Sequence, residues 1–377
     1  MVKKEVAILG VGVTKFGRVT GRGLVDMARE AGFKALKDAG VDFRDIQIGF
    51  CAHCNQPMGT GLDCFAELGM TGIPVTNVEV ACASESRGVL LAADMIAAGV
   101  YEMALVIGIE KMPRGMVPSI GDLSDMPYKF LTGIMPMPGE YAIQARGHMH
   151  LYGTKVEHFA KAAEKAHRNG SLNPNATYQE VFSLEEIMNS RMIADPITML
   201  MCSANADGAT ATVVCSTKKA RQHTTKPVLL VGWAAGTPMY VKGESISLAE
   251  GPTKYLGKKV YEMSRLGPED VDVSQVHDAF SPGEIFIVED LGFCPEGGGG
   301  PFVWEGNTEI EGKIPVNTDG GLVSCGHPIG ATGGRMIAEL CWQLRETAGS
   351  RQVPGKPKVA LLHNQGLGGT NVMMFKM

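Results

Sequence analysis

The sequence has no cluster of basic residues. Its 35 Lys and Arg residues are scattered along 377 positions and are outnumbered by 40 acidic residues, which leaves a formal net charge of −5 at pH 7. Proteins that bind nucleic acids concentrate positive charge on one face or along one helix. We therefore expect no nucleic-acid partner.

Long uncharged apolar runs are absent as well. The apolar run at residues 6–9 follows two lysines, as in a signal peptide, but it is short and no small-residue cleavage pattern follows it. The most apolar later stretch, residues 88–109, contains Asp94 and Glu102, whereas a spanning helix needs about 18 apolar residues. We expect neither a leader nor a membrane segment.

The nine cysteines lack the regular spacing of a disulfide framework. Such cysteine usage suits a reducing compartment, and we expect a cytoplasmic protein. Cys51, His53 and Cys54 have zinc-like spacing, but no second pair accompanies them. We therefore predict no metal site.

Length and composition indicate a folded chain of two or three domains, since a typical domain has about 100–200 residues. Hydrophobic residues make up 45% and charged residues 20% of the sequence. Apolar runs that favour strands alternate with segments of helical periodicity. Strands are predicted at residues 6–13, 46–51, 77–80 and 103–109, and helices at 24–39 and 86–98. This alternation predicts an α/β fold with parallel, helix-covered sheets.

The C-terminal part repeats this order, which indicates an internal duplication. Strands are predicted at residues 228–233, 273–277 and 359–363, and helices at 253–266 and 331–344. We assign residues 1–110 plus 206–222 to the first half and residues 223–377 to the second. Residues 111–205 form an insertion, with a Met- and Pro-rich loop and then helices at 141–152, 156–171 and 184–190, which we expect to carry specificity. Alternation at residues 207–214 predicts a strand that rejoins the first sheet.

Four motifs carry the chemistry. They are Cys82 at the start of a helix, Gly326-His327-Pro328 after a glycine-rich run, His277-Asp278-Ala279-Phe280, and His363-Asn364 before a glycine loop. A helix start lowers the pKa of a nearby cysteine, so Cys82 is predicted to be a reactive thiolate, although a cysteine in an apolar run is more often inert core.

In this order the motifs resemble the thiolase superfamily, and the His-Asp and His-Asn motifs resemble its sterol-carrier-protein-type branch, which includes acetyl-CoA acetyltransferases. The resemblance covers essentially the whole chain. It implies the thiolase fold, in which two duplicated βαβ-type halves form a five-layered αβαβα core. It also implies a cytoplasmic acyltransferase with coenzyme A as co-substrate.

The resemblance implies roles for the motif residues. Cys82 would attack the β-keto carbon of an acyl-CoA and carry the acyl group, and His327 would activate it. One oxyanion site would come from His277 and His327, and another from the backbone N–H groups of Cys82 and Gly366. Asn364 would belong to the same site. The alternative for His277 is a structural histidine paired with Asp278.

The resemblance also carries three further expectations. Ser203 and Met149 are the candidate contacts to coenzyme A. The chain would form a homodimer through the first sheet and work with a small zinc-ribbon/OB-fold subunit in a heteromeric complex. Because the sequence ends at Met377, directly after the thiolase-like part, we expect no appended sterol-carrier domain.

One departure from the family pattern concerns a second catalytic cysteine. Asn364 and Ala279 stand in the two motifs where it would be found, and Cys325 is more typical of packing. The proton for the leaving enolate would then come from His277, His327, water or the substrate.

The missing cysteine favours an α-substituted β-ketoacyl-CoA, such as benzoylsuccinyl-CoA in degradation. Such an acyl group would lie against an apolar lining, with core packing as the alternative role for these side chains: Met126, Tyr128, Phe130, Met135, Met137 and Tyr141. Alternative functions are a Claisen-condensing or retro-aldol C–C lyase acting on acyl-CoA, and a non-catalytic or lipid-carrier scaffold.

Overall fold

A computed structural model describes residues 4–18, 21–113, 137–224, 226–237, 252–367 and 369–377. Most of the Met- and Pro-rich loop, including Met126, Tyr128, Phe130 and Met135, lies outside these residues. No helix within the described ranges combines the length and the apolarity needed to cross a membrane.

The first half contributes five strands to one sheet, in the order β3-β2-β4-β7-β1. Its elements are β1 (Val6–Val13), α1 (Leu24–Ala39), β2 (Ile48–Ala52), α2 (Thr60–Ala66), β3 (Val75–Val78), α3 (Ser84–Ala97), β4 (Met103–Glu110), β7 (Gly208–Ser216) and α8 (Thr217–Ala220). The strand predicted at residues 207–214 is confirmed as β7, which rejoins this sheet between β4 and β1.

The second half continues the same sheet as β8-β11-β10-β9, with β8 paired to β1. Its elements are β8 (Val228–Gly236), α9 (Pro252–Ser264), β9 (Val273–Gln275), α10 (Pro282–Asp290), α11 (Gly299–Trp304), α12 (Thr332–Leu344), β10 (Val359–Gly366) and β11 (Gly369–Lys376). A bridge between Ser274 and Val316 stands where the fifth strand would be. The strand order therefore mirrors that of the first half, and the predicted duplication is confirmed.

The prediction of parallel sheets is wrong for the middle of the sheet. Only β2 with β3 and β4, and β9 with β10, run parallel. β7 pairs antiparallel with β1 and β4, and β11 pairs antiparallel with β8 and β10. The short β10–β11 connection, in which Gly366 pairs with Gly369, can only join antiparallel strands, since a parallel pair needs a long crossover.

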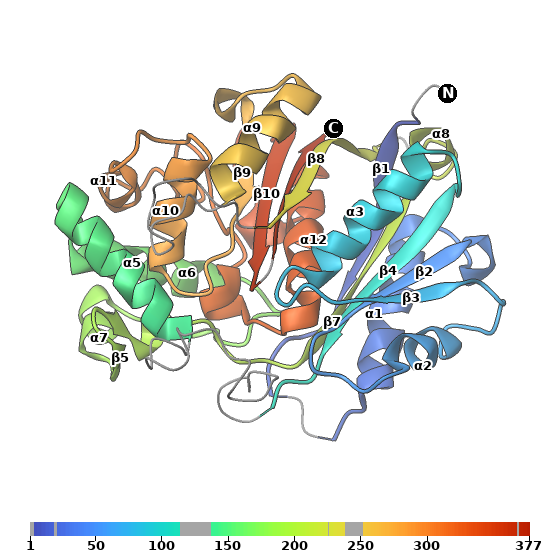
Figure 1. The fold of residues 1–377 in the computed structure, drawn as a ribbon, viewed down its shortest axis with the longest axis horizontal. Coiled ribbons are helices and arrows are strands. Elements are labelled where there is room, and N and C mark those ends of the chain that lie inside the picture. The colour runs from blue at the N-terminus through green and yellow to red at the C-terminus, as the bar shows by residue number, and fades with distance from the viewer. Residues whose placement is uncertain (1–3, 19–20, 114–136, 225, 238–251, 368) are drawn as a thin grey trace.

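Helices and strands stack in five layers: α1, the strands of the first half, α3 with α12, the strands of the second half, and α9 (Figure 1). α1 covers one face of the first half's strands, and α9 covers the outer face of β8 and β11. α3 and α12 pack against each other between the two halves. Gly12 of β1 lets α1 approach, because a Cβ there would lie 2.1 Å from the carbonyl oxygen of Ala31. Both faces of β1, β4 and β7 are thus covered, and all their residues are buried.

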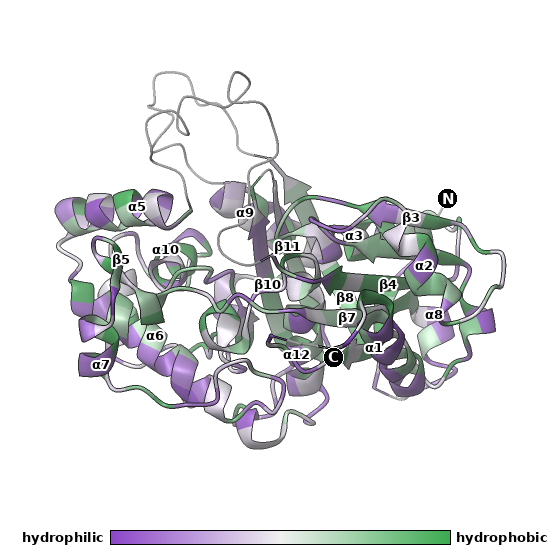
Figure 2. Ribbon diagram, turned by 90° about the horizontal axis from the view of Figure 1, so that it is seen from below, coloured by the Kyte–Doolittle hydropathy of each residue, from purple (hydrophilic) through white to green (hydrophobic). Residues whose placement is uncertain are grey.

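The insertion packs beside the second half (Figure 1). It comprises α5 (Met137–Tyr152), α6 (Val156–Ser171), α7 (Leu184–Asn189), β5 (Met192–Ala194) and β6 (Ile197–Thr198). α6 contacts α10 and α11, and Lys165 of α6 forms a buried ion pair with Glu284 of α10. Figure 2 shows apolar residues concentrated along β4, β7 and β8, whereas α5 and α7 carry many polar residues.

Candidate active site

Cys82 lies in a tight turn between β3 and α3. Ala81, immediately before it, has a φ of +47°, which is rare for a residue with a side chain. The Ser84 hydroxyl accepts a hydrogen bond from Val80 N at 2.9 Å and donates one to Ala81 O at 2.6 Å. Glu79 accepts from Ala81 N at 2.7 Å. These bonds hold the strained turn and present the sulfur ahead of the helix.

His327 lies within hydrogen-bond distance of Cys82. Its Nε2 is 3.1 Å from Cys82 Sγ, and its Nδ1 is 2.7 Å from the Thr332 hydroxyl. That hydroxyl donates its single proton to Pro328 O at 3.0 Å, so it must accept from His327 Nδ1. A neutral His327 therefore carries its proton on Nδ1 and turns the lone pair of Nε2 toward the thiol.

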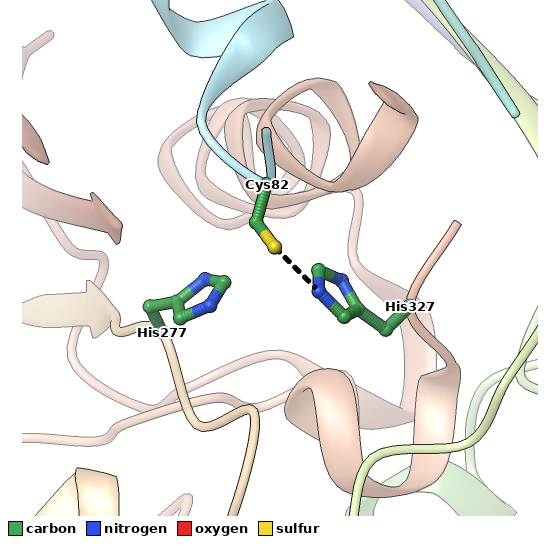
Figure 3. Close-up of side chains that lie close together, drawn as sticks. All are labelled: Cys82, His277 and His327. Atoms are coloured by element: carbon green, nitrogen blue, oxygen red, sulfur yellow. Dashed lines mark hydrogen bonds between the residues drawn. The ribbon is translucent and has the colours of Figure 1, made fainter. Parts of the chain in front are cut away.

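His277 follows β9 and completes the group. Its ring lies edge-on to that of His327, with centroids 5.4 Å apart, and its Nδ1 is 3.1 Å from the side-chain amide of Asn364. Cys82, His277 and His327 point toward one another from different parts of the chain (Figure 3). The structure thus brings together four of the five predicted catalytic side chains.

Asp278 does not pair with His277. Its carboxylate accepts from Leu322 N at 2.7 Å, and burial raises its pKa to about 7. The backbone before His277 is held by Asn317. Its side chain accepts a hydrogen bond from Val276 N at 2.8 Å and donates one to Val276 O at 3.1 Å. The alternative of a structural His277 paired with Asp278 is therefore wrong.

The predicted low pKa of Cys82 is also wrong. Burial raises the pKa of the thiol to about 12, because the thiolate loses its hydration. Neither Lys nor Arg is among the groups that shift this pKa. Burial, assisted by Arg335, lowers the pKa of His327 to about 3. Burial likewise holds the pKa of His277 well below its ordinary value. These pKa shifts favour a neutral thiol beside a neutral imidazole.

Alkylation of Cys82 by iodoacetamide is expected to accelerate about tenfold per pH unit between pH 6 and pH 9. The thiolate is the reactive form, and below a raised pKa its fraction grows with pH. Rates measured by mass spectrometry across this range test the expectation. A rate that is already constant above pH 6 would show a preformed thiolate–imidazolium pair.

Gly366, the fifth predicted catalytic residue, touches the Cys82 turn through its backbone. A Cβ on Gly366 would lie 2.2 Å from Val80 O and 3.0 Å from Cys82 N. We expect Gly366→Ala to displace the turn and lower kcat at least about tenfold, while Gly147→Ala, in a helix and with open space around the added Cβ, serves as the control. Circular dichroism checks folding, and unchanged turnover of Gly366→Ala would contradict the predicted contact.

Cys82, His277 and His327 also form the one set of three potential metal ligands within the described residues, with ligand atoms within 4.8 Å of one another. The Cys51–Cys54 segment does not contribute such a set there. The expectation that the chain holds no metal stays a prediction.

The two candidate coenzyme A contacts lie in different places. Ser203 N donates to Ala279 O at 2.9 Å, next to His277. Met149 lies on α5, half-buried against the core. Their roles stay predictions. Cys325 is buried and accepts from Asn173 at 3.4 Å, which agrees with packing.

Sequence reasoning missed several residues that hold the site. Thr332, which fixes the proton on His327, lies just after the Gly326-His327-Pro328 motif, and nothing in the sequence beyond that position indicates its role. Ser84 and Glu79, which hold the Cys82 turn, gave no signal beyond their position near the cysteine.

Comparisons with known proteins agree with this geometry. Residues 6–218 match the family described as "Thiolase, N-terminal domain" and residues 240–375 the family described as "Thiolase C-terminal domain-like". Sterol carrier protein 2 of Bos taurus is 38% identical over 100% of this chain and 73% of that protein. An acetyl-CoA acetyltransferase of Methanothermobacter thermautotrophicus is 38% identical over 97% of this chain and 98% of its own length.

Among solved structures, the Ltp2-ChsH2(DUF35) aldolase superposes with a TM-score of 0.87 at 28% identity, covering 100% of this chain and 98% of that one. The two family matches together span nearly the whole sequence, and the duplicated five-layer architecture agrees with them. The chain belongs to the thiolase family.

Proposed function

We propose that this acyltransferase of the thiolase family cleaves a β-ketoacyl-CoA by acyl transfer through Cys82 to coenzyme A. The observation that carries the proposal is the 3.1 Å contact between Cys82 Sγ and the unprotonated Nε2 of His327. A nucleophile within hydrogen-bond reach of a base, itself oriented by a third group, is the arrangement that covalent catalysis requires. Thr332 is that third group.

The first half-reaction follows from which atoms of Cys82 and His327 carry a proton. His327 Nε2 takes the thiol proton as Cys82 Sγ attacks the β-keto carbon, and the carbonyl oxygen becomes an oxyanion. The carbon–carbon bond then breaks, which leaves an acyl-Cys82 thioester and the enolate of a shortened acyl-CoA. The proton held by His327 goes to the α-carbon of that enolate, so no second cysteine is needed.

The second half-reaction reverses the roles. His327 takes the proton of the coenzyme A thiol, whose sulfur attacks the acyl-Cys82 carbonyl. The new acyl-CoA leaves, and His327 returns the proton to Cys82 Sγ.

Trapping the thioester tests this proposal. The protein is mixed with acetoacetyl-CoA or a longer 3-ketoacyl-CoA without free coenzyme A, and intact-mass spectrometry should find an acyl adduct that peptide mapping places on Cys82. Added coenzyme A should release it. Cleavage of a 3-hydroxyacyl-CoA, with no acyl adduct from the 3-ketoacyl-CoA substrates, would support the other candidate, a retro-aldol C–C lyase, which the 28% identity to an aldolase favours.

For the substrate we propose an α-substituted, aryl β-ketoacyl-CoA, with benzoylsuccinyl-CoA as the named example. Phe280 follows His277 by three residues, and its ring packs against that of Tyr141 with centroids 4.8 Å apart. This aromatic pair supports a flat acyl group. Assays would compare acetoacetyl-CoA, a straight-chain 3-ketoacyl-CoA and the aryl compound. Preference for acetoacetyl-CoA would return the enzyme to short-chain thiolysis.

We further propose a homodimer and a small zinc-ribbon/OB-fold partner. β3 lies at the edge of the sheet, and Met58, Leu62 and Met70 of the same region are exposed apolar residues. The Ltp2-ChsH2(DUF35) structure contains by its name a second component. Light scattering gives the oligomeric state, and a purified chain that binds coenzyme A tightly and turns over alone would contradict the partner.

A further inference from the structure

The side-chain amide of Asn364 decides which nitrogen of His277 carries a proton. If its NH₂ group faces His277 Nδ1, that nitrogen must accept, and the neutral ring carries its proton on Nε2. If its oxygen faces Nδ1, the proton sits on Nδ1 instead. Only the first arrangement gives His277 an N–H donor for an oxyanion in front of Cys82.

The direction of the amide is set by a chain of hydrogen bonds that begins at Arg87. The Arg87 guanidinium can only donate, and its Nε donates to the side-chain oxygen of Asn371 at 2.9 Å. The NH₂ group of Asn371 therefore faces the other way, where it donates to Ala83 O at 3.0 Å and to the Ser86 hydroxyl at 2.7 Å.

Ser86 then has one proton and two acceptors within reach. Ala83 O is 3.0 Å away, but it already accepts from Arg87 N at 2.9 Å and from Asn371, and a carbonyl has two lone pairs. The oxygen of Asn364 is closer, at 2.6 Å. The proton of Ser86 therefore goes to Asn364, whose NH₂ group is left to donate to His277 Nδ1.

We propose that Arg87, Asn371 and Ser86 are positioning residues that hold His277 in the tautomer with its proton on Nε2. They act through Asn364 and contact neither Cys82 nor His327 through any hydrogen bond of the described residues. The inference rests on the proposed function for its meaning, because the oxyanion of acyl transfer is what the Nε2 proton would stabilise. It also predicts poor metal binding, since a protonated Nε2 offers no lone pair.

The test uses the full-length protein labelled with ¹⁵N-histidine. Long-range ¹H–¹⁵N spectra report which ring nitrogen is protonated, and the His277→Ala spectrum assigns the His277 signals. The wild-type protein should show protonated Nε2. Asn371→Asp keeps the bond to Arg87 but removes the donor to Ser86. Ser86 can then donate to the carboxylate at position 371, the Asn364 amide turns its oxygen toward His277, and the ring proton of His277 should move to Nδ1. Asn364→Asp should move the same proton directly.

Kinetics give the second readout. Asn371→Asp should lower kcat by on the order of 10²–10³, as for a lost oxyanion donor, with KM changed less than about threefold. Iodoacetamide should alkylate Cys82 at the wild-type rate, since the Cys82–His327 pair is untouched. If Asn371→Asp fails to fold, Ser86→Ala replaces it and should show both tautomers. Thr212→Val is the control, because its buried hydroxyl has no partner among the described residues.

The outcomes separate the two proposals. Protonated Nδ1 in the wild-type protein, or an unchanged His277 tautomer in Asn371→Asp and in Ser86→Ala, overturns the positioning chain. The spectra need no substrate, so a tautomer shift in a protein that fails to form acyl-Cys82 would support the chain and overturn only the proposed function.

Discussion

Replacing Cys82 with alanine is expected to abolish acyl transfer and to leave the fold intact. Only the sulfur can form the covalent intermediate, so the loss should be on the order of 10⁴-fold or more. The thermal unfolding curve should stay close to that of the wild-type protein, because the turn is held by Ser84 and Glu79 rather than by the thiol. Steady-state thiolysis and circular dichroism measure the two effects.

Cys341→Ala is the matched control, since Cys341 is a buried cysteine of α12 outside the site. Competitive labelling adds an independent check. Iodoacetamide should modify Cys82 faster than Cys215 and Cys341, because Cys82 is only half-buried whereas those two cysteines are buried. The nucleophile assignment would be wrong if Cys82 proved no more reactive than Cys215 or Cys341.

The second large effect concerns the two histidines. His327→Ala and His277→Ala should each lower kcat by on the order of 10²–10³, since the first removes the base that exchanges protons with Cys82 and the second removes an N–H donor to the oxyanion. His327→Ala should also slow alkylation of Cys82, because the thiol loses its proton acceptor, whereas His277→Ala should not. The exposed His223 provides the control substitution. Equal alkylation rates in both variants and in the wild-type protein would refute this division of roles.

Local pattern predicted many of the elements. The strand at residues 6–13 and the helices at 24–39 and 156–171 have the predicted ends. Their apolar spacing is uninterrupted, and Gly40, with a φ of +66°, ends α1 where a left-handed residue is needed. The resemblance to the thiolase superfamily also predicted the grouping of Cys82, His277 and His327.

Long-range effects escaped the sequence. The sequence pattern did not predict β11, because this strand follows β10 after a very short turn and begins within the glycine loop. The upward shift of the pKa of Cys82 comes mainly from burial, which depends on segments that are distant in the sequence. Ser86 and Asn371 are 285 residues apart, so no local pattern could have linked them.

The two mirrored halves contribute different side chains to the site. The loop between β3 and α3 carries Cys82, whereas the segment between the Val316 bridge and α12, which occupies the mirrored position in the second half, carries Asn317 and His327. The proposed acyl transfer therefore needs a residue from each half: the fold keeps its two-fold pattern, but the nucleophile and the base come from different copies.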